Sequence, residues 1–113
     1  MATIAELKAY GADTDAALAR LMGNEAFYLK LIPRIFDDDN FGKLSASIAE
    51  GDLEKAFEAA HSLKGVLGNL ELTPLLKPVV EVTELLRAKK EVDYSSSLDE
   101  IAAQKEALEA LFN

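Results

Sequence analysis

Cysteine and tryptophan are absent from this chain of 113 residues, and histidine occurs once, as His61. Without cysteine the chain can form neither a disulfide nor a thiolate metal site. A single histidine excludes a multi-histidine metal site, and it leaves the serines at 95–97 without a second imidazole to act as their base. Any imidazole chemistry therefore belongs to one side chain.

A surplus of positive charge is also missing. Lysine and arginine total 12 against 20 aspartates and glutamates, for a net charge of -8. This balance argues against binding nucleic acid or an anionic membrane surface. No stretch reaches the roughly 18 apolar residues of a membrane span, and no basic segment followed by an apolar run opens the chain. We expect a cytoplasmic, monomeric protein, and the start at Met1 favours a free-standing one.

Proline and glycine are few, at three and six residues, while alanine, leucine, glutamate and lysine are abundant. This composition favours helix, and no segment alternates with the period of two that strands require. The breaking and capping residues predict helices at about 4–10, 14–22, 25–36, 41–50, 53–70, 74–90 and 98–112. Pro33 should kink the third, while Thr73 should cap the sixth and Ser97, with Glu100, the last. The short loops predict an all-α, up-and-down antiparallel bundle, one domain over residues 1–113.

The segment AHSLKGVLGNLE, residues 60–71, holds the only histidine and two glycines inside a predicted helix. Each glycine there costs about 1 kcal/mol relative to alanine. At roughly 100° per residue, one stripe of this helix is apolar. It comprises Leu53, Ala56, Phe57, Ala60, Leu63, Leu67 and Leu70. His61 falls at its edge toward solvent, beside Lys64 and Gly65 and nearly in line with Gly68.

This placement has two readings. Glycines that leave the imidazole uncovered would suit a surface nucleophile that a large partner must reach, with Lys64 near an incoming phosphoryl group. Alternatively, His61 is a polar residue at the helix boundary and the glycines permit close packing between helices.

Residues 60–65, A-H-S-L-K-G, follow G-D-L-E-K-A-F-E-A in the middle of that helix. They resemble the H-x-L-K-G signature of histidine-containing phosphotransfer (Hpt) domains. Residues 17–36, ALARLMGNEAFYLKLIPRIF, resemble the region that precedes the signature in that family, so the similarity covers most of the chain. The resemblance implies a four-helix bundle with short extra N-terminal helices that cover one end.

The resemblance also implies a function. His61 would accept a phosphoryl group from a phosphoaspartate on a receiver domain and pass it to another receiver, with Lys64 near the phosphoryl oxygens and Gly65 giving access. The expected partners are response-regulator receiver domains and a sensor or hybrid histidine kinase. Mg²⁺ would come from the receiver, so the chain itself needs no cofactor or metal and is not an enzyme. The expected docking residues around His61 are Phe57, Glu58, Gly68 and Asn69.

The sequence departs from the family pattern at two places. Glu71 stands where the family often has glycine, ten residues after the histidine, which concerns the turn that ends the helix. Many members carry a glutamine on the following helix that bonds the imidazole, and here the candidates are Glu81, Thr83 or Glu84. A carboxylate would hold the ring and raise its pKa, whereas a threonine would only orient it.

Three other functions are weighed against this one. The first is an adaptor that keeps the fold with an inert histidine, against which the intact set of His61, Lys64 and Gly65 argues. The second is a fragment of a sensor histidine kinase, but Ser62 stands where that class has an acidic residue. The third is a metal site at Asp37–Asp39, but consecutive side chains diverge and lack the spacing of a calcium loop.

Overall fold

This computed structural model describes residues 2–113, which fold into helices joined by short loops. The elements are α1 (Ile4–Tyr10), α2 (Thr14–Arg20), α3 (Glu25–Leu31), the 3₁₀ helix η1 (Ile32–Asp37), α4 (Asn40–Glu50), α5 (Leu53–Asn69), α6 (Thr73–Arg87) and α7 (Ser95–Phe112). No strand occurs among these residues, so the all-α prediction is confirmed.

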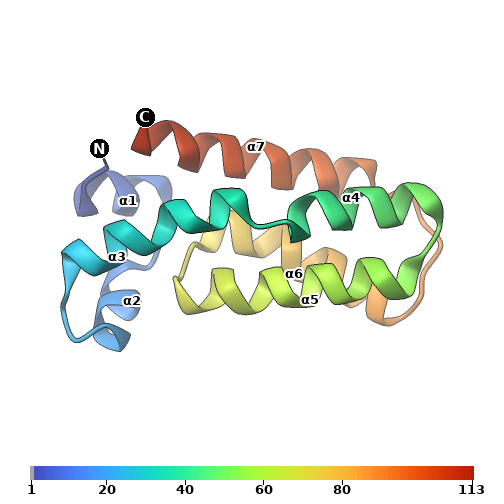
Figure 1. The fold of residues 1–113 in the computed structure, drawn as a ribbon, viewed down its shortest axis with the longest axis horizontal. Helices are drawn as coiled ribbons and strands as arrows, with labels where there is room; N and C mark the ends of the chain where they lie inside the picture. The colour runs from blue at the N-terminus through green and yellow to red at the C-terminus, as the bar shows by residue number, and fades with distance from the viewer. Residues whose placement is uncertain (1) are drawn as a thin grey trace.

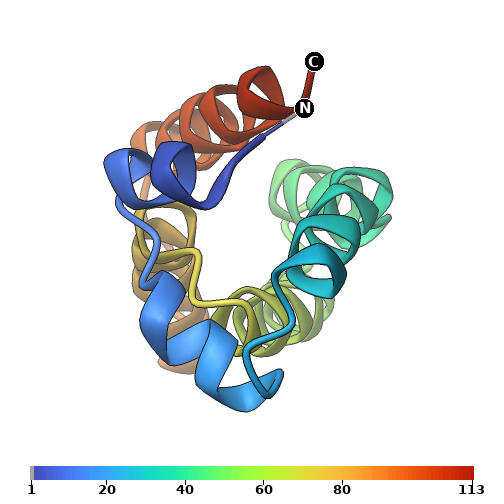
Figure 2. The same cartoon turned by 90° about the vertical axis from the view of Figure 1, so that its left-hand side faces the viewer.

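Four long rods form the bundle. The first is α3, η1 and α4 in one broken line, followed by α5, α6 and α7, each running antiparallel to the one before it (Figure 1). Helix α5 packs between α4 and α6, and α6 packs against α7. Helices α1 and α2 lie at the end of the bundle where α5 turns into α6 (Figure 2). This is the predicted four-helix bundle with short extra N-terminal helices.

The core forms from the apolar stripes that the helical period sets. On α5, Ala56, Ala60, Leu63 and Leu67 are buried as predicted, as is Leu70 at its C-cap, whereas Leu53 and Phe57 are half-buried. They meet leucines and valines of the neighbouring rods, among them Leu44, Leu75, Val79, Val82, Leu86 and Leu108, all almost fully buried. Each such side chain contributes about 1.5–3 kcal/mol by leaving water. The opposite side of α5 is left to solvent.

Pro33 breaks the first rod where the sequence predicts a kink. Proline has no N–H to donate and its ring crowds the carbonyl one turn back, so α3 tightens into η1 after Leu31. Asp38 then takes an extended conformation, and its Oδ1 accepts a hydrogen bond from the Asn40 backbone N–H at 2.8 Å. The acidic run therefore acts as the joint between η1 and α4.

Two predicted caps are wrong. Thr73 lies inside α6, whose N-cap is Leu72, and its hydroxyl donates to the Glu71 carbonyl at 3.5 Å. Helix α7 begins at Ser95, so Ser97 lies inside it. The Asp93 carboxylate accepts from the Ser95 backbone N–H at 2.9 Å, and the helix starts three residues earlier than predicted. Within residues 2–113, no helix combines the length and apolar character needed to cross a bilayer.

Candidate functional site

His61 lies in the middle of α5 with its side chain exposed. The helix is 17 residues long, and its N-terminus is capped by the Asp52 carboxylate, which accepts a hydrogen bond from the Lys55 backbone N–H at 3.1 Å. The buried residues nearest in sequence, Ala60 and Leu63, face the core on the other side. The imidazole therefore stands on a long, anchored helix and faces outward, as the helical wheel predicts.

An aromatic ring supports the imidazole from one turn earlier. The rings of Phe57 and His61 are nearly parallel, with centroids 5.6 Å apart and an interplanar angle of 18°. The Arg87 guanidinium, from α6, lies over the Phe57 ring at 5.0 Å from its centroid. Such stacked and cation–π contacts are worth about 0.5–1.5 kcal/mol each. Phe57 thus links the histidine on α5 to a cation on α6.

A small group of charges follows the seam between α5 and α6. The Arg87 Nε donates to Glu84 Oε2 at 2.9 Å, and both side chains are about half exposed. The pKa of the Glu84 carboxyl is lowered, first by this hydrogen bond, then by the charge of Arg87, and also by Lys64 across the seam. Arg87 was not among the residues predicted from the sequence. The pattern that could have indicated this ion pair is the Glu-x-x-Arg spacing on α6, the helix after the one that carries the histidine.

None of the three candidates on α6 bonds the imidazole. Thr83 is buried and donates its hydroxyl to the Val79 carbonyl at 2.7 Å. Glu84 is engaged by Arg87, and Glu81 is exposed next to Lys77, Glu100 and Gln104, on the α7 side of α6. No hydrogen bond among residues 2–113 involves the His61 ring. In this structure the ring is supported by stacking.

The two glycines beside His61 do not serve helix packing. A methyl group added at Gly65 or Gly68 would meet nothing within 4 Å outside the local helix backbone. At Gly11, by contrast, the added carbon would lie 2.8 Å from the Pro74 side chain. Gly65 and Gly68 therefore leave open surface along the histidine face, where another molecule could approach the helix backbone.

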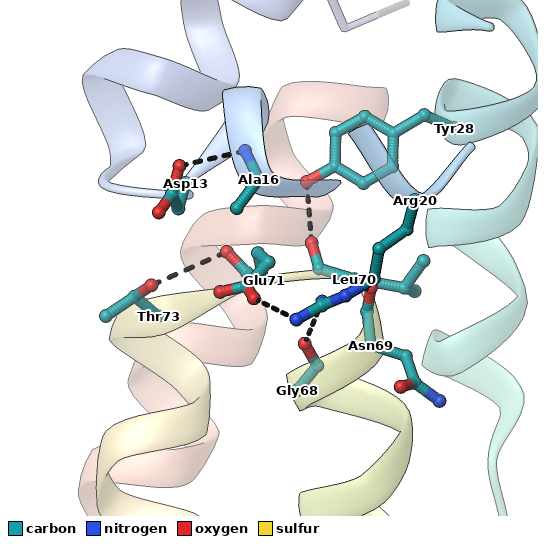
Figure 3. A network of polar contacts seen from close by, with 9 residues as sticks. All are labelled: Asp13, Ala16, Arg20, Tyr28, Gly68, Asn69, Leu70, Glu71 and Thr73. Atoms are coloured by element: carbon teal, nitrogen blue, oxygen red, sulfur yellow. Dashed lines mark hydrogen bonds and ion pairs between the residues drawn. The ribbon is translucent and has the colours of Figure 1, made fainter. Parts of the chain in front are cut away.

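The C-terminal end of α5 is tied to the N-terminal helices by a polar network (Figure 3). The Arg20 guanidinium donates to the carbonyl oxygens of Gly68 and Asn69 at 3.0 and 3.1 Å and pairs with the Glu71 carboxylate at 2.8 Å. The Tyr28 hydroxyl donates to the Leu70 carbonyl at 2.7 Å. The carbonyls of Asn69 and Leu70 at the helix end thus gain partners, the Gly68 carbonyl gains a second one beside the Glu71 N–H, and the cation complements the helix dipole.

Comparison with protein families matches residues 37–112 to the Hpt domain. The chain belongs to the Hpt family. The match spans more than half of the 113 residues and includes α4 to α7, hence His61 and all of α6. Hpt domains act in histidine phosphotransfer in two-component signalling, as carriers of the phosphoryl group. No curated protein and no solved structure matches the chain.

The departure of this Hpt domain at Glu71 has a structural explanation. Glu71 takes a left-handed conformation, with φ of 55°, which glycine adopts without steric cost. A glutamate there costs about 1 kcal/mol in strain. This strain is partly compensated by the ion pair between the Glu71 carboxylate and Arg20, at 2.8 Å. The Glu71 backbone carbonyl also accepts a hydrogen bond from the Asp13 N–H at 3.0 Å. The turn keeps its shape, and the side chain helps to tie α2 to it.

The predicted docking residues of this Hpt domain lie along the exposed side of α5. Glu58 and Asn69 are exposed, and Phe57 and Gly68 are half-buried. Their part in docking stays a prediction. Val66, which the sequence did not single out, is 37% exposed. Val66 and Asn69 border a pocket of about 350 Å³ between α5 and the first rod, lined also by Leu31, Arg34, Ile35, Asp38 and Leu70.

No group of three or more histidine, cysteine, aspartate or glutamate side chains within residues 2–113 is arranged to hold a metal ion. Of the acidic run at 37–39, Asp38 is used in the turn before α4.

Proposed function

We propose that this Hpt domain accepts a phosphoryl group on His61 from the phosphoaspartate of a receiver domain and passes it to a second receiver. The observation that carries the proposal is the exposed imidazole in the middle of α5, with open surface at Gly65 and Gly68 on its own side. A receiver presents its aspartate from a folded domain, so the acceptor must be reachable by a large body. A histidine that is buried or covered by neighbouring side chains could not be reached by such a domain.

The transfer step needs the neutral imidazole. The lone pair of an unprotonated ring nitrogen of His61 forms the new N–P bond as the bond from phosphorus to the receiver carboxylate oxygen breaks. That oxygen leaves with the bonding electron pair as a carboxylate, and the proton on the other ring nitrogen stays in place. The reverse reaction loads the second receiver. Lys64, one turn on from His61, supports the phosphoryl oxygens by its charge.

The metal in this proposal belongs to the partner. Mg²⁺ held by the receiver's acidic pocket would neutralise charge on the phosphoryl group during transfer. This chain then works as a carrier and requires no cofactor of its own. Its upstream source of phosphate is a sensor or hybrid histidine kinase, and the receivers are response-regulator domains.

The test is transfer from a phosphorylated receiver domain of the same cell, in the presence of Mg²⁺, to three purified proteins. These are the wild type, His61→Gln and Ser62→Ala, the last removing the hydroxyl adjacent to the histidine. We expect acid-labile, base-stable label on the wild type and on Ser62→Ala, and none on His61→Gln. A folded wild type that takes label from none of the cell's receivers would instead support the adaptor with an inert histidine.

A further inference from the structure

The contacts between α5 and α6 fix which charges flank the histidine. Arg87 lies over Phe57, and α6 runs antiparallel to α5 (Figure 1). Three residues back along α6 is Glu84, a rise of about 4.5 Å, and four residues on along α5 is His61, a rise of about 6 Å in the same direction. Glu84 is therefore nearly level with His61, across the seam.

Glu84 pairs directly with one cation of this site and is influenced by the charge of a second. Arg87 bonds its carboxylate from one side at 2.9 Å. The charge of Lys64, one turn beyond His61 on α5, also lowers the pKa of this carboxyl. Glu84 and Arg87 are each about half exposed, so both side chains are accessible to an anion at the surface. On the seam between α5 and α6, the Glu84 carboxylate thus lies with the two cations Arg87 and Lys64.

We propose that Glu84 is an internal counterion for Lys64 and Arg87 that weakens their hold on a phosphoryl group at His61, and so shifts the transfer equilibrium toward the receiver. This inference rests on the proposed function. A phosphoryl group brings about two negative charges. It must compete with Glu84 for the cations and is repelled by the carboxylate itself. The carboxylate thereby raises the free energy of the phosphohistidine relative to the free histidine.

The size of the effect follows from one unit charge near the phosphoryl group. A unit charge about 4 Å from one charge of the phosphoryl group in water would shift an equilibrium constant about fivefold, which sets the scale of the expected effect. Glu84→Gln removes the charge and keeps the shape of the side chain. Glu81→Gln makes the same charge change one turn earlier on α6, on the side toward α7 and away from the two cations.

The experiment measures the equilibrium partition of labelled phosphate between the chain and a receiver domain. Protein concentrations are kept below those at which the two form a complex, so that docking affinity does not enter the result. We expect Glu84→Gln to move the ratio of phosphorylated chain to phosphorylated receiver about fivefold toward the chain. Glu81→Gln should match the wild type, and both variants should show the same unfolding midpoint.

The outcomes separate the two proposals. If the wild type takes no label, the relay function itself fails. If it takes label on His61 but Glu84→Gln partitions like Glu81→Gln, or moves phosphate toward the receiver, the relay stands and the counterion role is wrong. Arg87→Gln tests the opposite direction. Because this variant loses a cation, it should move the partition of phosphate toward the receiver.

Discussion

At the scale of single residues, the site combines an exposed nucleophile with helix positions that lower stability. Gly65 lies in the interior of α5, where alanine would be favoured by about 1 kcal/mol. No neighbouring atom requires the small side chain, since an added carbon meets open space. A residue that is locally unfavourable without a packing reason is the kind that functional sites retain.

Gly65→Ala should therefore raise stability and reduce transfer. We expect the free energy of unfolding to rise by about 1 kcal/mol and Tm by roughly 4 °C. The rate of phosphotransfer from a receiver should fall about tenfold or more, because the methyl group stands where the partner must approach. Thermal unfolding and transfer rates measure the two effects.

Gly42→Ala is the matched control for this prediction. Gly42 is exposed in α4, and an added carbon there also meets nothing within 4 Å. For Gly42→Ala, the free energy of unfolding should also rise, while the rate of phosphotransfer stays unchanged. Equal rates for Gly65→Ala and wild type would show that Gly65 does not provide access.

At the scale of elements, α5 is anchored at both ends by different means. Its start is local, since Asp52 caps its own helix. Its end depends on α2 and α3, which bring Arg20 and Tyr28 to the carbonyls of the last residues. Both residues lie outside the part of the chain that matches the Hpt family. The N-terminal helices thus complete a structure on which the histidine face depends.

Arg20→Gln should loosen this end of α5. We expect a loss of about 1 kcal/mol, because two hydrogen bonds and a half-exposed ion pair are removed while solvent screens the charges. Amide hydrogen exchange should quicken at Leu70 to Leu72 and in the last turn of α5, and stay unchanged around Asp52. Lys30→Gln, the same charge change on an exposed residue of α3, is the control. Uniform exchange rates in both variants would contradict the anchoring role.

At the scale of the whole molecule, two tyrosines connect distant parts of the chain. The Tyr10 hydroxyl, from α1, donates to the Gln104 carbonyl in α7 at 3.0 Å, and Tyr28 reaches Leu70. Burial raises the pKa of Tyr10 to about 12, with a smaller effect of Glu100. Burial likewise raises the pKa of Tyr28 to about 12, followed by the charges of Glu71 and Asp13.

Stability should consequently fall at alkaline pH. In the unfolded chain tyrosine titrates near pH 10, so between about pH 10 and 12 the unfolded state has lost protons that the folded state keeps. The contribution is complete below pH 10 and declines by up to about 1.4 kcal/mol per pH unit for each tyrosine. Urea midpoints from pH 9 to 11.5 measure the decline. Tyr28→Phe should show a shallower slope, and an identical slope would exclude Tyr28 as a source.

Much of the element layout could be predicted because its causes are local. Gly11 and Gly51 end α1 and α4 in left-handed conformations, and Pro33 and Asp38 break the first rod. The predictions at Thr73 and Ser97 failed because a cap depends on which backbone N–H groups the fold leaves free. There, Leu72 and Tyr94 are buried among other helices and set the start of the segment.

The sequence by itself determined the helical class, the buried stripe of α5 and the outward direction of His61, because a period of 3.6 residues sorts side chains without knowledge of any neighbour. Only the tertiary structure decided what surrounds the histidine. Arg87 reaches Phe57, Glu84 lies near Lys64, and Arg20 caps α5 from 48 residues away. These contacts depend on the register between packed helices, and register is set by the fit of many side chains across both surfaces.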